Sequence, residues 1–147
     1  MKKLLFLFVL AVSAKNLPAQ PGAAIAQADP NAPVITFESE VIDFGSVQQG
    51  SEQVRTFTFT NTGKTPLVIT AIKGQCGCTH VDDAGTQAPI PPGGSASFKV
   101  KYDTQTRVGM FDKKITVYCN ASNAPNGWIE VRITGKVVPS GAPAPGN

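Results

Sequence analysis

The chain has 147 residues, of which 13 are Lys or Arg and 10 are Asp or Glu. This length accommodates one domain of ordinary size. The formal net charge of +3 is uneven, because Lys2, Lys3 and Lys15 all precede position 20. Without them, ten basic residues balance ten acidic ones. A neutral domain lacks the basic surface that nucleic-acid binding requires, so no nucleic-acid partner is expected.

The N-terminus has the three parts of a secretory signal peptide: a basic start, an apolar run over residues 4–14, and small residues after it. The run is shorter than the roughly 20 apolar residues that span a bilayer, and no later stretch is apolar enough to span one. We therefore expect residues 1–19 to be a signal peptide, with Ala14 and Ala26 as alternative cleavage positions. The mature protein is expected to be periplasmic or extracellular and soluble, without an integral membrane segment.

Two terminal segments differ in composition from the rest. Residues 20–33 and 139–147 are rich in Ala, Pro, Gly and Gln and contain almost no large apolar side chain. Such segments cannot bury enough surface to offset the entropy lost on ordering, so they are predicted to be a flexible leader and a flexible tail. Residues 34–138 remain, and their number suits an immunoglobulin-like sandwich of about 100 residues.

Apolar residues in this central part recur with a period of two, which is typical of strands with one buried face. The alternation is clearest over residues 95–103, whereas residues 67–72 are apolar enough to predict a strand buried on both faces. No helical apolar stripe is present. Six or seven short strands separated by turns predict an all-β sandwich. The predicted strands are 34–37 with 41–47 (one broken strand), 52–60, 67–72, 95–103, 111–120 and 128–138.

Several short motifs follow one another in a recognisable order. They are Asp43-Phe44-Gly45, Phe57-Thr58-Phe59-Thr60-Asn61-Thr62-Gly63, Pro66-Leu67-Val68-Ile69, Cys76-Gly77-Cys78-Thr79, Pro91-Pro92-Gly93, and Gly109 before Ile115-Thr116-Val117. In this order they resemble a secreted bacterial family of unknown function whose signature is Cys-Gly-Cys-Thr, and also Hydin-type and major-sperm-protein-like domains. The resemblance implies a seven-stranded immunoglobulin-like β-sandwich in an exported or cell-envelope protein, and it brings no established reaction or cofactor. Cys119 departs from the family pattern, which has a small residue such as serine there.

The cysteines and the single histidine are the candidate site residues. Cys76, Cys78 and His80 are spaced by two, so they would project from one face of an extended strand. Two thiolates and an imidazole suit Cu(I) or Zn(II), and Cys119 is available as a fourth ligand.

The same cysteines also allow two kinds of disulfide in an oxidising compartment. A Cys76–Cys78 bond would close a very small ring and be easily reduced, which suits thiol exchange, and His80 would favour a thiolate. Alternatively, Cys119 bridges Cys76 or Cys78 in a structural bond that closes a loop of about 40 residues and adds about 3–4 kcal/mol. Either pairing leaves one odd thiol.

No enzyme is predicted, because Cys-His-Asp catalysis also needs an oxyanion site and nothing in the sequence marks one. We expect a non-enzymatic module of the bacterial cell envelope that binds or spaces other proteins, through its edge strands and the Pro- and Gly-rich loop 82–94. The alternative is a thiol-redox or metal-binding (Cu/Zn) module that uses the Cys-Gly-Cys-Thr-His segment.

Intact-mass measurement of the exported protein is expected to give a chain that begins at Gln20, because the residues before this position end the signal pattern. A chain beginning at Lys15 or Gln27 would select one of the other two cleavage positions. An uncleaved exported chain would contradict the signal-peptide interpretation.

Overall fold

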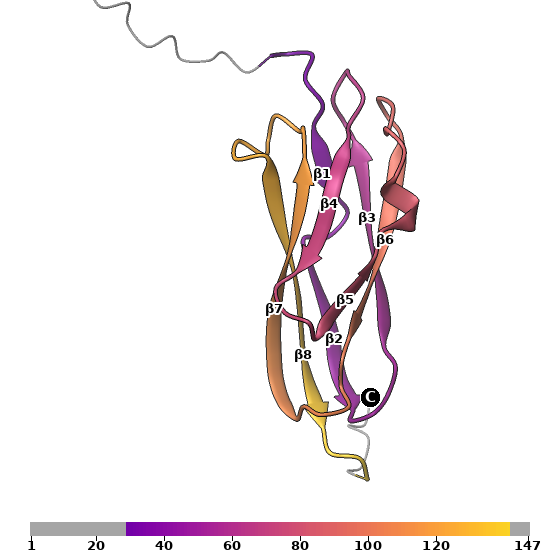
Figure 1. Ribbon diagram of the computed structural model, residues 1–147, viewed down its shortest axis with the longest axis vertical. Coiled ribbons are helices and arrows are strands. Elements are labelled where there is room, and N and C mark those ends of the chain that lie inside the picture. The colour runs from indigo at the N-terminus through magenta and orange to yellow at the C-terminus, as the bar shows by residue number, and fades with distance from the viewer. Residues whose placement is uncertain (1–28, 142–147) are drawn as a thin grey trace, which may run out of the picture.

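The computed structural model describes residues 29–141. The predicted signal peptide, most of the leader and the end of the tail lie outside these residues. Two four-stranded sheets pack face to face (Figure 1), which confirms the predicted all-β, immunoglobulin-like sandwich. No helix in the described part is long and apolar enough to cross a membrane.

Each sheet takes strands from distant parts of the chain. The first sheet has the order β1-β3-β6-β5, with β1 Ile35–Phe37, β3 Val54–Asn61, β6 Ser95–Tyr102 and β5 Thr79–Asp82. The second has the order β2-β8-β7-β4, with β2 Val41–Gln48, β8 Trp128–Val138, β7 Gly109–Cys119 and β4 Ile69–Gly74. Neighbouring strands are antiparallel except β2 and β8, which are parallel. A short 3-10 turn, η1 Ala84–Thr86, follows β5.

The described residues form eight strands. The broken first strand accounts for two of them, because it is divided between the sheets, and another is β5, which the periodicity did not predict. β1 pairs with β3 in the first sheet. After the bend at residues 38–40, β2 pairs with β8 in the second sheet. The interruption seen in the sequence is therefore the point at which the chain changes sheets.

The prediction that residues 67–72 are buried on both faces is wrong. β4 lies at an edge of the second sheet and buries only its inward face, where Ile72 is located. Val68 is 38% exposed, and Thr70 and Lys73 are also exposed. β-branched residues suit any pleated, half-buried strand, so their abundance did not indicate how many faces were covered.

Contacts with the sandwich begin slightly before position 34. Pro33 is buried, and its carbonyl accepts a hydrogen bond from the Ser122 N–H at 2.8 Å. The Thr65 hydroxyl donates to the Asn31 carbonyl at 3.0 Å. Residues 31–33, predicted as part of the leader, thus contact the domain.

Aromatic side chains fill the space between the sheets. Phe57 and Phe98 stack within the first sheet, with ring centroids 5.2 Å apart. Tyr102 of that sheet stacks on Phe111 of the other, at 3.9 Å. Stacked aromatic pairs add to the free energy gained from their buried area. The Tyr102–Phe111 contact therefore stabilises the packing of one sheet against the other.

The completely buried Asn61 joins three segments at the end of β3. Its side-chain amide donates to the carbonyls of Thr65 (2.8 Å) and Ile90 (3.0 Å), and its side-chain oxygen accepts from the Gly63 N–H (3.0 Å). Next to it, Leu67 and Ile90 exchange two backbone hydrogen bonds. The loop 82–94 is thereby held against β3 and is more ordered than its Pro and Gly content predicts.

Replacing Asn61 with Ala is expected to lower the free energy of unfolding by about 2–4 kcal/mol, because it removes a fully buried amide and its hydrogen bonds to Thr65, Ile90 and Gly63. Urea unfolding measures this change. Thr56→Ala, at an exposed position of the same strand, is the control and should change stability by no more than about 0.5 kcal/mol. Similar losses in both variants would contradict the structural role of Asn61.

Candidate functional site

The Cys-Gly-Cys segment carries the chain from one sheet to the other. β4 ends at Gly74 and β5 begins at Thr79, on the side of the sandwich that faces the viewer in Figure 1. Cys76 and Cys78 form a disulfide, with their Cα atoms 5.2 Å apart. Because they lie in a bend and a turn, the predicted extended strand through Cys76, Cys78 and His80 is wrong, and so is their common face.

A threonine hydroxyl lies beside both sulfurs. Thr79 Oγ1 is 3.8 Å from Cys76 Sγ and 3.9 Å from Cys78 Sγ. Since disulfide sulfurs carry no hydrogen, the hydroxyl must be the donor in either contact. Thr79 is itself buried, and its backbone N–H donates to the Cys76 carbonyl at 3.1 Å. The spacing argument, which singled out Cys76, Cys78 and His80, missed Thr79.

The two cysteine residues differ in their exposure to solvent. The Cys78 residue is 4% exposed and belongs to the hydrophobic core. Cys76 is partly exposed and packs against the margin of that core. A reagent approaching from solvent therefore meets Cys76 first.

The ends of the Cys-Gly-Cys turn lie against each other. A Cβ atom added to Gly74 would lie 2.5 Å from the Thr79 carbonyl oxygen, a contact that no side chain tolerates. A Cβ added to Gly77, at the middle of the turn, would meet no atom within 4 Å. Thus Gly74 is required by packing, whereas Gly77 has space around it.

Cys119 is a free, buried thiol at the end of β7, beside the first residue of β4 and away from the Cys-Gly-Cys turn. It pairs with Ile69, whereas Gly74 pairs with Ile115. Five strand residues separate these two positions, which amounts to roughly 16 Å, whereas a disulfide needs Cα atoms within about 7 Å. The predicted bridge from Cys119 to Cys76 or Cys78 is therefore wrong.

Burial raises the pKa of the Cys119 thiol above 9.0, although a hydrogen bond from the backbone of Ala121 partly opposes this effect. The thiol consequently stays neutral in the folded protein near pH 7 and is a poor nucleophile.

His80 lies apart from the sulfurs. On β5 the buried Thr79 points inward and the exposed His80 points to the outer face of the sheet. It therefore cannot act on the thiolates as the sequence hypothesis required. Within residues 29–141, no three His, Cys, Asp or Glu side chains are grouped as a metal site.

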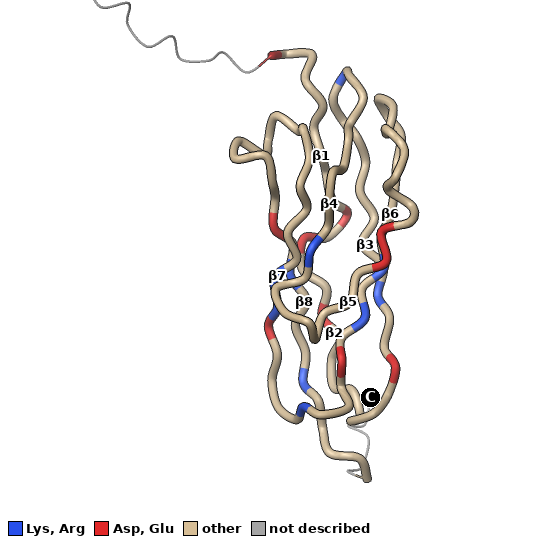
Figure 2. Tube along the Cα trace, viewed as in Figure 1, with Lys and Arg blue, Asp and Glu red and all other residues tan. Residues whose placement is uncertain are grey.

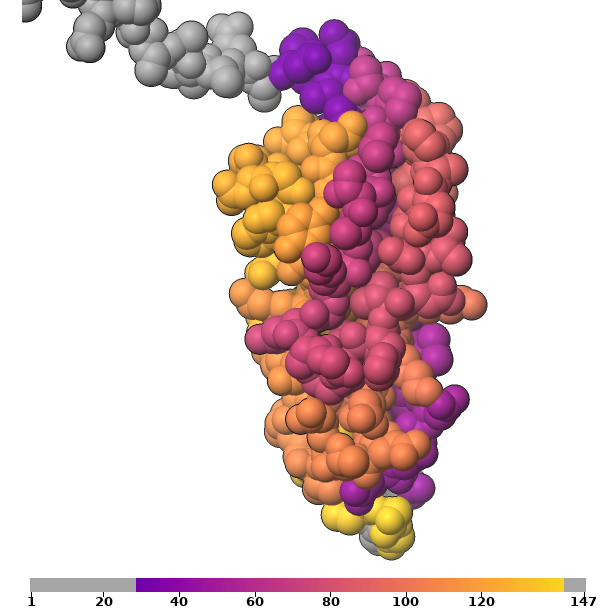
Figure 3. All heavy atoms as spheres, viewed as in Figure 1, coloured from indigo at the N-terminus to yellow at the C-terminus, as the bar shows by residue number. Residues whose placement is uncertain are grey.

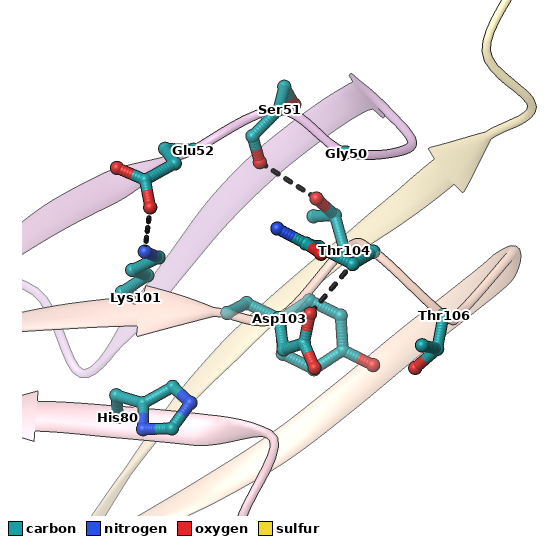
Figure 4. A pocket seen from close by; sticks show the side chains of 10 residues that line it. Gly50, Ser51, Glu52, His80, Lys101, Asp103, Thr104 and Thr106 are labelled. Atoms are coloured by element: carbon teal, nitrogen blue, oxygen red, sulfur yellow. Dashed lines mark hydrogen bonds and ion pairs between the residues drawn. The ribbon is translucent and has the colours of Figure 1, made fainter.

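His80 instead lines two adjoining hollows on the outer face of the first sheet, one of about 300 Å³ and one of about 250 Å³. Both hollows also contain Lys101, the cross-strand partner of His80, which forms an ion pair with Glu52 (Figure 4). The Thr104 hydroxyl donates to the Ser51 carbonyl at 2.7 Å and holds the loops at the rim. Sequence reasoning missed Lys101 and Glu52, because only strand pairing brings them together.

A second surface feature lies on the outer face of the second sheet and extends over β8, β7 and the edge strand β4. Trp128, which is 38% exposed, is the direct cross-strand partner of Tyr118, and the Lys73 Nζ atom is 5.6 Å from the Tyr118 ring centroid. Figure 2 shows few charged residues in the upper part of the molecule compared with its middle and lower parts. We call Thr70, Lys73, Tyr118 and Trp128 the aromatic edge surface.

Gly74→Ala is expected to lower the free energy of unfolding by about 1–3 kcal/mol, because the added methyl group overlaps the Thr79 backbone. Gly77→Ala is the matched control, and its stability should stay close to that of the unchanged protein. Thermal or urea unfolding of the two variants tests the close contact. Equal effects would show that the turn is less tightly closed than described.

The alkaline stability of the protein should depend on Cys119. Its folded-state pKa is raised, so as pH rises past about 9 the unfolded chain loses the thiol proton first, and the free energy of unfolding falls. Cys119→Ala is therefore expected to lose less stability than the unchanged protein between about pH 8 and about pH 10. Urea unfolding at both pH values gives the two slopes, and equal slopes would contradict a raised pKa.

Comparison with solved structures supports the fold. A protein of unknown function from Porphyromonas gingivalis W83 superimposes with a TM-score of 0.63 at 19% identity, over 82% of this chain and 51% of that one. The VesB protease of Vibrio cholerae superimposes with a TM-score of 0.56 at 18% identity, over 69% of this chain and 31% of VesB. The ASH/PapD-like domain 7 of human CEP192 superimposes with a TM-score of 0.55 at 13% identity, over 90% of this chain and 99% of that domain.

These similarities establish the sandwich architecture and nothing of the activity. The chain spans about half the length of the Porphyromonas protein and about a third of VesB. No curated protein matches the sequence. Residues 35–137, nearly the whole sandwich, match the family described as Protein of unknown function (DUF1573). The chain therefore belongs to the DUF1573 family.

Proposed function

We propose that the protein is an exported, non-enzymatic module of a bacterial cell envelope that binds an extended segment of another envelope protein. The signal-peptide pattern at the N-terminus supports export. The observation that carries the binding function is the open edge of β4, with the partly exposed Tyr118 on the adjacent strand β7 and the exposed Trp128 on β8, the next strand of the same sheet.

The backbone of β4 can pair with a further strand. The Gln75 N–H donates to the Lys114 carbonyl at 3.0 Å, so this is a hydrogen-bonded pair of the β4–β7 ladder. Because such pairs alternate along antiparallel strands, Ile72 turns its N–H and C=O away from β7. Thr70 forms a bulge without a partner on β7. Unpaired groups at a sheet edge are a template for an extended peptide.

Aromatic side chains provide the anchors for such a peptide. Trp and Tyr are enriched at the centres of protein interfaces, where burial of one side chain often contributes a large part of the binding free energy. The space-filling view shows β4 exposed along the front of the molecule, where a partner strand has room to approach (Figure 3). The other edges are less suitable: β1 has three residues, β5 has four, and the one aromatic residue of β2, Phe44, is buried.

A metal-binding function receives less support from this geometry. Cys76 and Cys78 are bonded to each other, and His80 points to the opposite side of β5. The two sulfurs are therefore unavailable as thiolate ligands in this state, and the imidazole is not directed toward them.

A photo-reactive amino acid at Thr70 is expected to cross-link to one main envelope protein in the native host. The same group at Thr56, an exposed threonine on the other sheet, is the matched control and should give no such adduct. Adducts of equal yield at both positions, or at neither, would count against the β4 edge and favour a spacer role.

Trp128→Ala is expected to weaken the affinity for that cross-linked protein by tenfold or more, because loss of an aromatic anchor costs about 2 kcal/mol. Calorimetry with the purified pair measures the dissociation constant. Circular dichroism must show that the variant is folded, and an unchanged dissociation constant in a folded variant would refute the anchor role.

A further inference from the structure

We propose that the Cys76–Cys78 disulfide is a thiol-exchange site that oxidises a pair of cysteine thiols in another polypeptide. In this exchange Cys76 is the sulfur attacked, Cys78 is the leaving group, and Thr79 is the positioning residue that stabilises the departing thiolate. The inference rests on the turn between β4 and β5 and does not depend on the binding function proposed for the β4 edge.

The difference in solvent exposure between Cys76 and Cys78 determines which sulfur a thiolate can attack. A thiolate must approach one sulfur of the disulfide in line with the bond, and solvent reaches the partly exposed Cys76. Cys78 is 4% exposed and packs in the core, so its sulfur is shielded from an incoming thiolate. Attack at Cys76 places the new negative charge on Cys78.

The structure provides a donor for that charge. Burial alone disfavours a thiolate, and a hydrogen bond to the charged form opposes this effect. Thr79 Oγ1 is 3.9 Å from Cys78 Sγ and is already directed at the disulfide. The backbone on both sides is fixed, since the Cys78 carbonyl accepts from the Asp103 N–H at 2.8 Å and the Thr79 N–H donates to the Cys76 carbonyl.

The disulfide contributes little to the free energy of unfolding. It joins residues only two apart in sequence, so it removes little entropy from the unfolded chain. The turn is also held by backbone hydrogen bonds from Gln75 to Lys114 and from Asp103 to Cys78. The protein is therefore expected to stay folded when the bond is reduced, as an exchange site requires.

The chemistry balances without a further reactant. A client thiolate attacks Cys76 Sγ, the S–S bond breaks, and its electron pair leaves on Cys78. A second client thiolate then attacks the client sulfur of the mixed disulfide and releases Cys76. The client dithiol loses two electrons and two protons and becomes a disulfide, while Cys76 and Cys78 become thiols. Each protein molecule oxidises one cysteine pair.

The order of the sulfurs is tested with glutathione on the oxidised protein in a Cys119→Ala background. After quenching with acid and N-ethylmaleimide, peptide mass mapping is expected to find glutathione on Cys76 and maleimide on Cys78. Glutathione mainly on Cys78, or equally on both residues, would overturn the proposed order.

The role of Thr79 is tested by comparing Thr79→Val, which removes the hydroxyl at equal size, with Thr79→Ser, which keeps it. In the same background, Thr79→Val is expected to raise the pKa of the Cys78 thiolate, followed by its ultraviolet absorbance, and to slow the reaction with glutathione about tenfold. Thr79→Ser should retain both values. A purely structural role would alter stability in Thr79→Val but leave the thiolate pKa unchanged, and that result would refute the positioning role.

The exchange itself is tested with a reduced synthetic peptide that contains two cysteines. The oxidised Cys119→Ala protein is expected to convert one equivalent of peptide to its disulfide, whereas the same protein carrying Cys76→Ser and Cys78→Ser should convert none. Circular dichroism of the reduced protein should match that of the oxidised form. Unfolding on reduction, or no peptide oxidation, would make the disulfide structural and the proposal wrong.

Discussion

The chain must cross from one sheet to the other within the four residues between Gly74 and Thr79, and this constraint shapes the site. The four residues do not run straight across, because a bend at Gln75 and Cys76 and a turn at Gly77 and Cys78 bring the two strand ends into contact. The crossing leaves no space for a side chain at Gly74, where the Thr79 carbonyl lies against the backbone. It also passes from solvent toward the core, so one cysteine is shielded more than the other. The asymmetry of the two sulfurs follows from this short path.

Much of the fold could be predicted from local sequence, because alternation along a strand records which face is buried. Residues 95–103 showed this clearly, and β6 occupies Ser95–Tyr102. Two features of the fold, the edge position of β4 and the change of sheet after β1, were not predicted for the same reason. Periodicity does not reveal a strand's place within a sheet, so the edge position of β4 could not be read from its β-branched residues. The bend between β1 and β2 was visible as an interruption, but its meaning as a change of sheet was not.

The candidate site was less predictable, because it depends on pairing between distant residues. The distance between Cys119 and the Cys-Gly-Cys turn follows from the β4–β7 register, which no local pattern specifies. The spacing of Cys76, Cys78 and His80 suggested a common face only under the assumption of a continuous strand, and the turn at Gly77 breaks it. Thr79 could have been noticed as the residue next to Cys78, but only the folded turn places its hydroxyl near both sulfurs.

The parallel pairing of β2 with β8 has a consequence for the time at which the protein can fold. Among the described strands, β2 pairs with β8 alone, and β8 is the last strand in the chain. A chain that emerges N-terminus first therefore holds β2 without its neighbour until almost the whole domain has appeared. Such long-range closure is slow compared with local pairing. Under the export that we propose, this delay is useful, because a domain that cannot close early stays unfolded enough to pass through a narrow translocation channel and folds only after it has crossed.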